Sequence, residues 1–162
     1  MRRVERSIED REELMDVLRK VTHMTLALSK ADEPYLVTVN YSFDEANMRV
    51  YFHCASAGKK IDILRSNPRV WGQVLEDLGY IQGECDHSFR TVQFSGNAEF
   101  ASDISEKKHA LELMIDRLEK TPETIKKDSL TKDKIEKVVI CKIVVEGMSG
   151  KHNIVHSADK PE

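Results

Sequence analysis

Residues 48–68, MRVYFHCASAGKKIDILRSNP, carry the most information in this chain. They predict a strand over Met48–Cys54, a turn of small residues, and a helix over 58–67 whose first turn holds Lys59 and Lys60. A helix N-terminus offers free backbone N–H groups and the positive end of the helix dipole, so it favours an anion such as a phosphate. Lysines are otherwise unfavourable there, by roughly 0.3–1 kcal/mol each. The residues alone leave a phosphate site and a solvated surface pair equally open.

The turn before this helix narrows the choice of ligand. Ser56 is a candidate N-cap or hydroxyl donor, and its small neighbours let the backbone approach a ligand closely. The chain has neither the Gly-x-x-x-x-Gly-Lys-Ser/Thr phosphate loop nor the Gly-x-Gly-x-x-Gly fingerprint. Nucleoside triphosphates and dinucleotides are therefore poor candidates.

Composition sets the broad class. The chain of 162 residues is 40% apolar and 33% charged, which suits a single globular domain over residues 1–162. Its net charge of -3 gives no global attraction to nucleic acid or to an anionic membrane. We see no apolar run long enough to span a bilayer and no signal peptide. The three widely spaced cysteines predict a reducing, cytoplasmic location.

The remaining elements follow from periodicity and turn residues. Ser7 and Asp10 resemble a capping signal for a helix over about 8–20. The runs 24–29 and 35–42 read as a hairpin, and Gly79–Glu84 extends or pairs with the strand expected over 69–75. The other expected elements are strands over 69–75, 89–100 and 138–145, a helix over 105–120, and a short helix or turn over 129–137.

These elements predict an α+β, mainly β, fold: a split, barrel-like sheet of about six antiparallel strands with flanking helices. Gly96, inside a predicted strand, indicates a bulge or a close approach of another backbone. Residues 153–162 read as a loose polar tail.

The run YLVTVNYSFDEANMRVYFHCASAGKKIDILRSNPRV resembles the flavin-binding core of the pyridoxamine 5′-phosphate oxidase-like split barrels. It is most similar to the nitroimidazole-resistance-type, flavin-nucleotide-binding branch. That branch has a Phe-His-x-Ala element before Gly-Lys-Lys or Gly-Arg-Lys, and then Asn-Pro-x-Val. The later FRTVQFSGNAEF and the closing MSGKHN resemble further family blocks, so the likeness spans roughly residues 8–153.

The resemblance implies flavin mononucleotide (FMN) as cofactor and assigns its contacts. Lys59 and Lys60 would hold the phosphate, and Thr91 would approach the ring or the ribityl chain. The remaining implied contacts are four residues along the isoalloxazine and two beside the ribityl phosphate: Thr38, Val39, Asn40 and Tyr41, then His53 and Cys54. It also implies a homodimer with flavin at the interface, where residues 150–152 could reach the neighbouring site.

Departures from the family pattern argue against oxidation of pyridoxamine phosphate itself. Thr38 and Thr91 stand where those oxidases have arginine and glutamine. The Trp- and Arg-containing C-terminus of those oxidases is missing here, because Trp71 is the only tryptophan. Cys54 and His152 replace a usual hydroxyl residue and a usual arginine.

The cysteines and histidines suggest three other kinds of site: a metal site, a haem site and a nucleophile pair. Cys85, Asp86 and His87 lack the spacing of a zinc site, so no metal is expected. His53 is an alternative haem ligand, although the lysines beside it suit a phosphate better. A Cys54–His53 nucleophile pair is disfavoured because adjacent strand residues point to opposite faces.

Three functions remain. The first is a flavoenzyme that transfers hydride or electrons between a donor and a small-molecule acceptor, with nitro compounds suggested as acceptors by the resemblance. The second is a flavin-binding module without catalysis, and the third is a haem-binding barrel. No side chain stands out as a catalytic acid or base.

Overall fold

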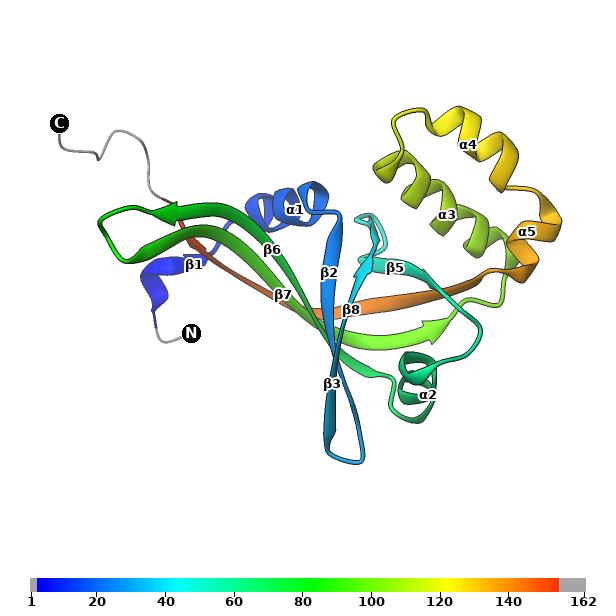
Figure 1. The fold of residues 1–162 in the computed structure, drawn as a ribbon, viewed down its shortest axis with the longest axis horizontal. Coiled ribbons are helices and arrows are strands. Elements are labelled where there is room, and N and C mark those ends of the chain that lie inside the picture. The colour runs from blue at the N-terminus through cyan, green and yellow to red at the C-terminus, as the bar shows by residue number, and fades with distance from the viewer. Residues whose placement is uncertain (1–2, 155–162) are drawn as a thin grey trace.

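The computed structural model describes residues 3–154 (Figure 1). Its strands are β1 (Ser7–Ile8), β2 (His23–Lys30), β3 (Glu33–Asn40), β4 (Ser42–Asp44), β5 (Arg49–Cys54), β6 (Arg69–Ile81), β7 (Asp86–Phe100) and β8 (Val139–Asn153). Its helices are the 3₁₀ turn η1 (Val4–Arg6), α1 (Arg11–Lys20), α2 (Lys59–Ser66), α3 (Ile104–Leu118), α4 (Pro122–Ser129) and α5 (Lys132–Lys137).

One antiparallel sheet holds the described strands in the order β3-β2-β6-β7-β8-β5-β4, and β1 pairs with β8. The sheet coils without closing, since β3 and β4 are its free edges. This confirms the predicted α+β split barrel. The six long strands are those expected from the sequence, while β1 and β4 are short additions.

Several predicted boundaries were wrong. Asp10 caps α1 by accepting a hydrogen bond from the Glu12 N–H at 3.0 Å, so the helix begins at Arg11, and Ser7 belongs to β1. Strand β6 continues past Leu75 to Ile81, so the expected extension of this strand is confirmed and its pairing with a separate strand over 79–84 is not. The short helix or turn predicted over 129–137 is the helix α5, and it is preceded by the unexpected helix α4. Of the predicted tail, residues 155–162 lie outside the described part of the chain.

The core fills the inside of the coiled sheet. Its largest fully buried side chains include Phe52, Phe94 and Leu26. Period-two alternation explains β6, where Val70 and Val74 are buried and Trp71 and Gln73 are exposed. Both faces of β5 carry a buried side chain, since Phe52 lies in the main core and Tyr51 lies in a second cluster beneath α3.

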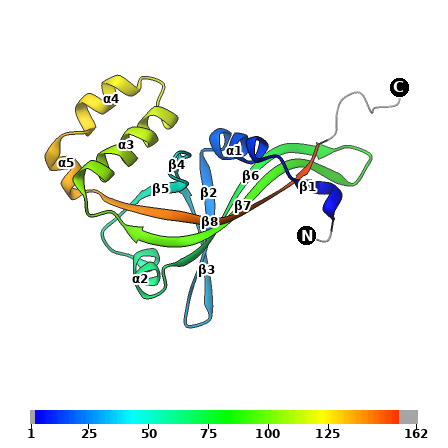
Figure 2. The same cartoon turned by 180° about the vertical axis from the view of Figure 1, so that it is seen from behind.

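The hairpin β2–β3 crosses the long strands, and α2 lies beside it (Figures 1 and 2). The predicted inward residues of α2, namely Ile61, Ile63 and Leu64, are all buried. These contacts fix α2 at the lower end of the molecule in both views. The segment α3–α5 lies on the other side of the long strands.

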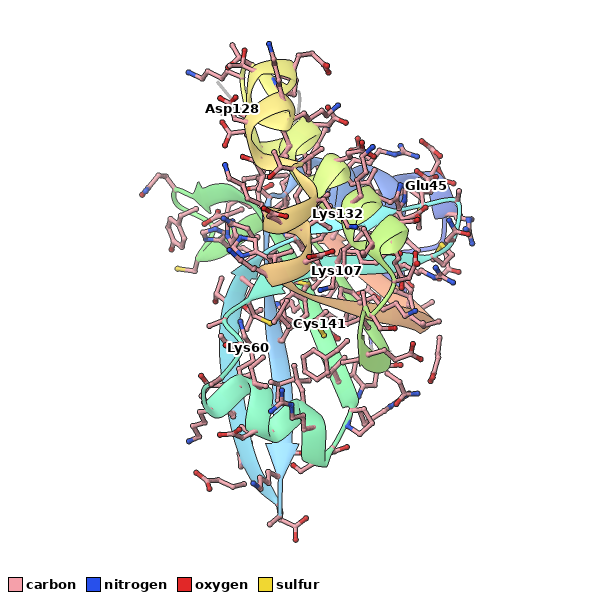
Figure 3. All side chains as sticks on the ribbon, turned by 90° about the vertical axis from the view of Figure 1, so that its right-hand side faces the viewer. Glu45, Lys60, Lys107, Asp128, Lys132 and Cys141 are labelled. Atoms are coloured by element: carbon pink, nitrogen blue, oxygen red, sulfur yellow. The ribbon has the colours of Figure 1, made fainter. Side chains whose placement is uncertain are left out.

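Two basic side chains tie the helical segment α3–α5 into the fold. The Lys107 ammonium donates to the Glu136 and Val138 carbonyl oxygens, at 3.2 and 2.9 Å, and so holds the end of α5 (Figure 3). The Arg117 guanidinium donates to the Leu18 and Val21 carbonyl oxygens at the end of α1. Cations suit helix C-termini because the last carbonyl groups carry partial negative charge.

Gly96 marks a tight approach between β7 and β8, as its position in the sequence predicts. The register shifts between Ser95 and Gly96, and a Cβ on Gly96 would lie 2.0 Å from the Val144 carbonyl oxygen. Backbone cannot move aside as a flexible side chain can. This glycine therefore permits the sharp coil of the sheet.

We expect Gly96→Ala to lower the free energy of unfolding by about 1–3 kcal/mol, because the methyl group would overpack the β7–β8 contact. Chemical denaturation measures this loss. Gly147→Ala is the matched control at the same bulge, since its Cβ would lie 3.5 Å from the Ser95 hydroxyl, an ordinary contact. Equal effects of the two substitutions would contradict the steric explanation.

Candidate functional site

The junction between β5 and α2 is an exposed cradle for an anion. Gly58 precedes α2 with a φ of 133°, a left-handed conformation that favours glycine. No side chain caps this helix, as in α4 and α5, whereas Asp10 and Asp103 cap α1 and α3. The first N–H groups of α2 therefore face outward without a capping acceptor. Ser56, the candidate cap, is exposed and does not fill that role.

Lys59 and Lys60 both lie at this junction but point in different directions. The Lys60 ammonium lies over the Phe52 ring, 5.2 Å from its centroid. The Lys59 ammonium lies over the Tyr35 ring at 5.0 Å and 3.7 Å from a Glu33 carboxylate oxygen. The structure thus places the two predicted phosphate ligands on either side of the α2 N-terminus.

His53 and Cys54 end β5 on opposite faces, so the structure gives no support to a Cys–His pair. His53 is exposed. Cys54 is half-buried, and its thiol lies 3.9 Å from the Val139 carbonyl oxygen. Burial raises the pKa of the Cys54 thiol, and Lys60 only partly opposes this, so the thiol stays protonated at neutral pH.

Strand β3 divides its predicted ligand residues between two faces. Thr38 and Asn40 are exposed on the outer face, while Val39 is half-buried against the core. The Thr38 hydroxyl lies 3.2 Å from that of Thr25 on β2. Only the outer pair presents side chains to a ligand on that face.

Tyr41 lies in the core and not on the exposed face that carries Thr38 and Asn40. It is fully buried, and its hydroxyl donates to the Leu18 carbonyl oxygen at 2.8 Å. The Arg117 guanidinium lies over its ring at 4.4 Å. Burial raises the pKa of Tyr41 to about 12. The side chain therefore joins α1 to α3.

Thr91 is far from the lysines within one chain. Phe100 lies opposite Cys141, which lies opposite Phe52, so Phe100 marks the β5 end of β7. About 30 Å of strand separates Thr91 from Phe100, at about 3.3 Å per residue. Thr91 instead pairs with Lys151 on β8. The predicted contacts at 91 and 150–152 thus lie together, at the other end of the long strands.

The outer face of the sheet carries a hollow that the sequence analysis missed. It has a volume of about 260 Å³ and is lined by Thr25, Ala27, Leu36, Trp71, Gly72, Gln73 and Gln93. Trp71 is 54% exposed, and Leu36 and Leu75 on the same face are 66% and 46% exposed. The alternation of β6 was the available signal, because it separates Trp71 and Leu75 from Val70 and Val74.

Other candidate chemistry finds little support in residues 3–154. Asp86 pairs with Arg6 at 3.0 Å and His87 with Asp77 at 2.6 Å, so these two side chains serve the β6–β7 hairpin. No group of three His, Cys, Asp or Glu side chains within that range could hold a metal ion. None of the described helices is both long and apolar enough to cross a bilayer.

Sequence comparison identifies the family. The family profile described as pyridoxamine 5′-phosphate oxidase matches residues 10–152, which is most of the chain. The chain belongs to the pyridoxamine 5′-phosphate oxidase family. This confirms the resemblance that the 48–68 region first indicated. The search of curated protein sequences gives no significant match to this chain.

Three solved structures illustrate the similarity of the fold. A candidate 5-nitroimidazole antibiotic resistance protein from Bacteroides thetaiotaomicron is 23% identical, with a TM-score of 0.72 over 90% of this chain and 85% of that one. A FAD-binding protein from Mesorhizobium loti is 24% identical, with a TM-score of 0.66 over 91% and 97%. A FAD- and haem-binding protein from Mycobacterium smegmatis is 16% identical, with a TM-score of 0.74 over 95% and 77%.

Tyr41→Phe tests whether Tyr41 serves the core. The folded state keeps the Tyr41 proton up to a pKa of about 12, whereas the unfolded state loses it near 10. Wild-type stability should therefore fall as pH rises from about 10 to 12, by up to about 2–3 kcal/mol from this group. We expect Tyr41→Phe to be less stable at pH 8, by about 1 kcal/mol, because it loses the hydrogen bond to Leu18.

The difference between the two proteins should shrink above pH 10. Denaturation curves at pH 8–11.5 measure it, and Cys141, whose burial raises its pKa to about 12, affects both proteins equally. A constant difference across this range would contradict the assignment of Tyr41 to the core.

Proposed function

We propose that this protein binds a flavin nucleotide through its riboflavin 5′-phosphate portion, for which FMN is the smallest ligand. The observation that carries the proposal is the uncapped first turn of α2, where Gly58, Lys59 and Lys60 combine free N–H groups with two ammonium groups. A phosphate monoester satisfies both the donors and the charge. Family membership and the flavin-binding neighbours support the same ligand class.

The proposed activity is oxidoreduction of a small-molecule acceptor by the bound flavin. When bound, the isoalloxazine would supply the hydride or electron chemistry, while the protein anchors the phosphate and shapes the acceptor site. The outer-face hollow, lined by Trp71, Gln73 and Gln93, has no titratable side chain among its lining residues. It can accommodate an acceptor but offers no acid or base of its own. The reducing conditions of the cytoplasm suit the three free cysteines.

We propose further that a second copy of the chain covers the outer face and completes the flavin site. Trp71, Leu36 and Leu75 expose a large apolar area there, which is unusual for a monomer. Thr91 and Lys151 lie at the far end of β7 and β8 from the α2 lysines. A two-fold dimer can bring that end of one protomer to the lysine end of its partner.

Replacing both Lys59 and Lys60 with alanine should weaken FMN binding strongly. Charge-assisted contacts to phosphate contribute about 1.5–3 kcal/mol each, so we expect at least a hundredfold loss of affinity. Quenching of flavin fluorescence measures it. The control Lys127→Ala/Lys132→Ala removes the same charge from α4 and α5, which lie across the sheet from α2 (Figure 1). Unchanged affinity in the α2 double variant would refute this phosphate site.

Trp71→Glu should convert the dimer to a monomer, since it places a charge in the proposed apolar interface. Light scattering after size-exclusion chromatography gives the mass, and circular dichroism checks that the variant folds. Trp71→Phe should remain dimeric. A monomeric wild type at micromolar concentration would contradict the proposed assembly.

An absorption spectrum separates the remaining alternatives. Bands near the visible wavelengths of oxidised flavin support the proposal, whereas a Soret band would indicate haem on a ligand such as His53. Flavin that is bound and reduced once, without steady-state turnover of any acceptor, would indicate a non-catalytic flavin-binding module.

A further inference from the structure

A second hollow continues the outer-face hollow toward the end of α1. Its volume is about 580 Å³, within the range of small-molecule sites. Thr25 and Gln73 line both hollows, so together they form one groove along β2 and β6. The first hollow has no ionisable side chain among its lining residues. The second has four: Lys20, His23, Glu76 and Asp77.

His23 differs from the other three ionisable side chains of this groove because it is unengaged. Lys20, Glu76 and Asp77 each contact a side chain of opposite charge or a histidine, at 2.5–2.9 Å. The His23 ring is exposed, and within residues 3–154 it takes part in no hydrogen bond or ion pair. Its ring nitrogens are therefore available to a ligand in the groove.

His23 also borders the residues expected beside the flavin ring. On the outer face it pairs with Asn40 across the β2–β3 ladder, and Thr25, two residues further along β2, pairs with Thr38. Side chains on the same face of a strand follow one another at about 7 Å. His23 thus lies next to both the proposed ring contacts and the acceptor hollow.

We propose that His23 is the general acid of the proposed reduction, and that the groove takes an uncharged acceptor whose reduced oxygen must be protonated, such as a quinone. The inference rests on the proposed flavin function and adds the proton donor that this function lacks. It also assigns the second hollow, which would hold the part of the acceptor that receives the proton.

The step balances in electrons and protons. A quinone receives two electrons and one hydrogen as hydride from the reduced flavin, which returns to its oxidised form. One N–H bond of the His23 imidazolium breaks, an O–H bond forms on the acceptor, and the product is a hydroquinone. The ring is exposed, so water can return the proton to it.

Histidine suits this step better than the other ionisable side chains of the groove. At neutral pH carboxylates carry no proton to give, and ammonium groups release theirs reluctantly. Imidazole changes its charge nearest to neutral pH, so it can both donate a proton and recover it. General acid catalysis of this kind typically contributes about 10²–10⁴-fold to a rate.

The test follows reoxidation of the reduced holoprotein by two acceptors, in an anaerobic stopped-flow instrument, after stoichiometric dithionite has reduced the bound flavin. Duroquinone takes up protons with its electrons, and its methyl groups leave no ring position for an exposed thiol such as Cys85 to attack. Ferricyanide takes electrons singly and needs no proton.

His23→Gln should slow reoxidation by duroquinone by about a hundredfold or more, because the amide cannot donate a proton as an acid does. Reoxidation by ferricyanide should be unchanged. His109→Gln is the matched control on α3, and it should change neither rate.

Two further measurements separate proton donation from a structural role. Imidazole added to His23→Ala should restore reoxidation by duroquinone, because it supplies the missing acid. In NMR spectra of the oxidised holoprotein, duroquinone should shift the ring signals of His23 and leave those of His109 in place. This second readout does not depend on turnover.

A wild-type duroquinone rate in His23→Gln would overturn the inference and leave the flavin proposal intact. So would equal losses with both acceptors, a duroquinone rate that imidazole cannot restore, or His23 signals that duroquinone does not shift. A purified protein that binds no flavin would instead refute the proposed function itself.

Discussion

The burial of one face of α2 is the constraint on which the candidate site depends. Ile61, Ile63 and Leu64 lie in the core, so the helix has a fixed axis and a fixed rotation. Its N-terminus must then project from the end of β5, with Lys59 and Lys60 on the first turn. Rotation of α2 by one residue would bury a lysine and expose an isoleucine. The hydrophobic core thereby positions groups that it does not itself contain.

The length of β7 and β8 places a second set of residues at the other end of the molecule. The coil at Gly96 lets these strands run from the helical segment α3–α5 to the β6–β7 hairpin (Figure 1). Thr91 and Lys151 therefore cannot meet the lysines of α2 in the same chain. A protein with half of a binding site at each end is suited to two-fold pairing, since one interface then completes two identical sites.

Local sequence signals predicted most of the fold. Alternation identified the long strands, and an apolar stripe identified α3 with Ala110, Met114 and Ile115 buried. The signals failed where contacts are long-range. Tyr41 is buried because Leu18 and Arg117, distant in sequence, satisfy its hydroxyl and cover its ring. The end of β8 is polar and glycine-containing, so only pairing with β7 and β1 makes it a strand.

The same limits apply to the site, and they bear on the substrate. The lysine pair could be recognised from the sequence because lysines are unfavourable in the first turn of a helix. The outer-face hollow could not, because its lining residues come from four different strands. Beside that hollow, Thr38 and Thr91 have short side chains whose hydroxyls contact the Thr25 hydroxyl and the Val74 carbonyl oxygen. The lining residues Thr25, Gln73 and Gln93 are polar but uncharged. Because no lining residue is a cation, nothing in the hollow would offset the cost of desolvating a phosphorylated substrate. The hollow therefore favours an uncharged acceptor.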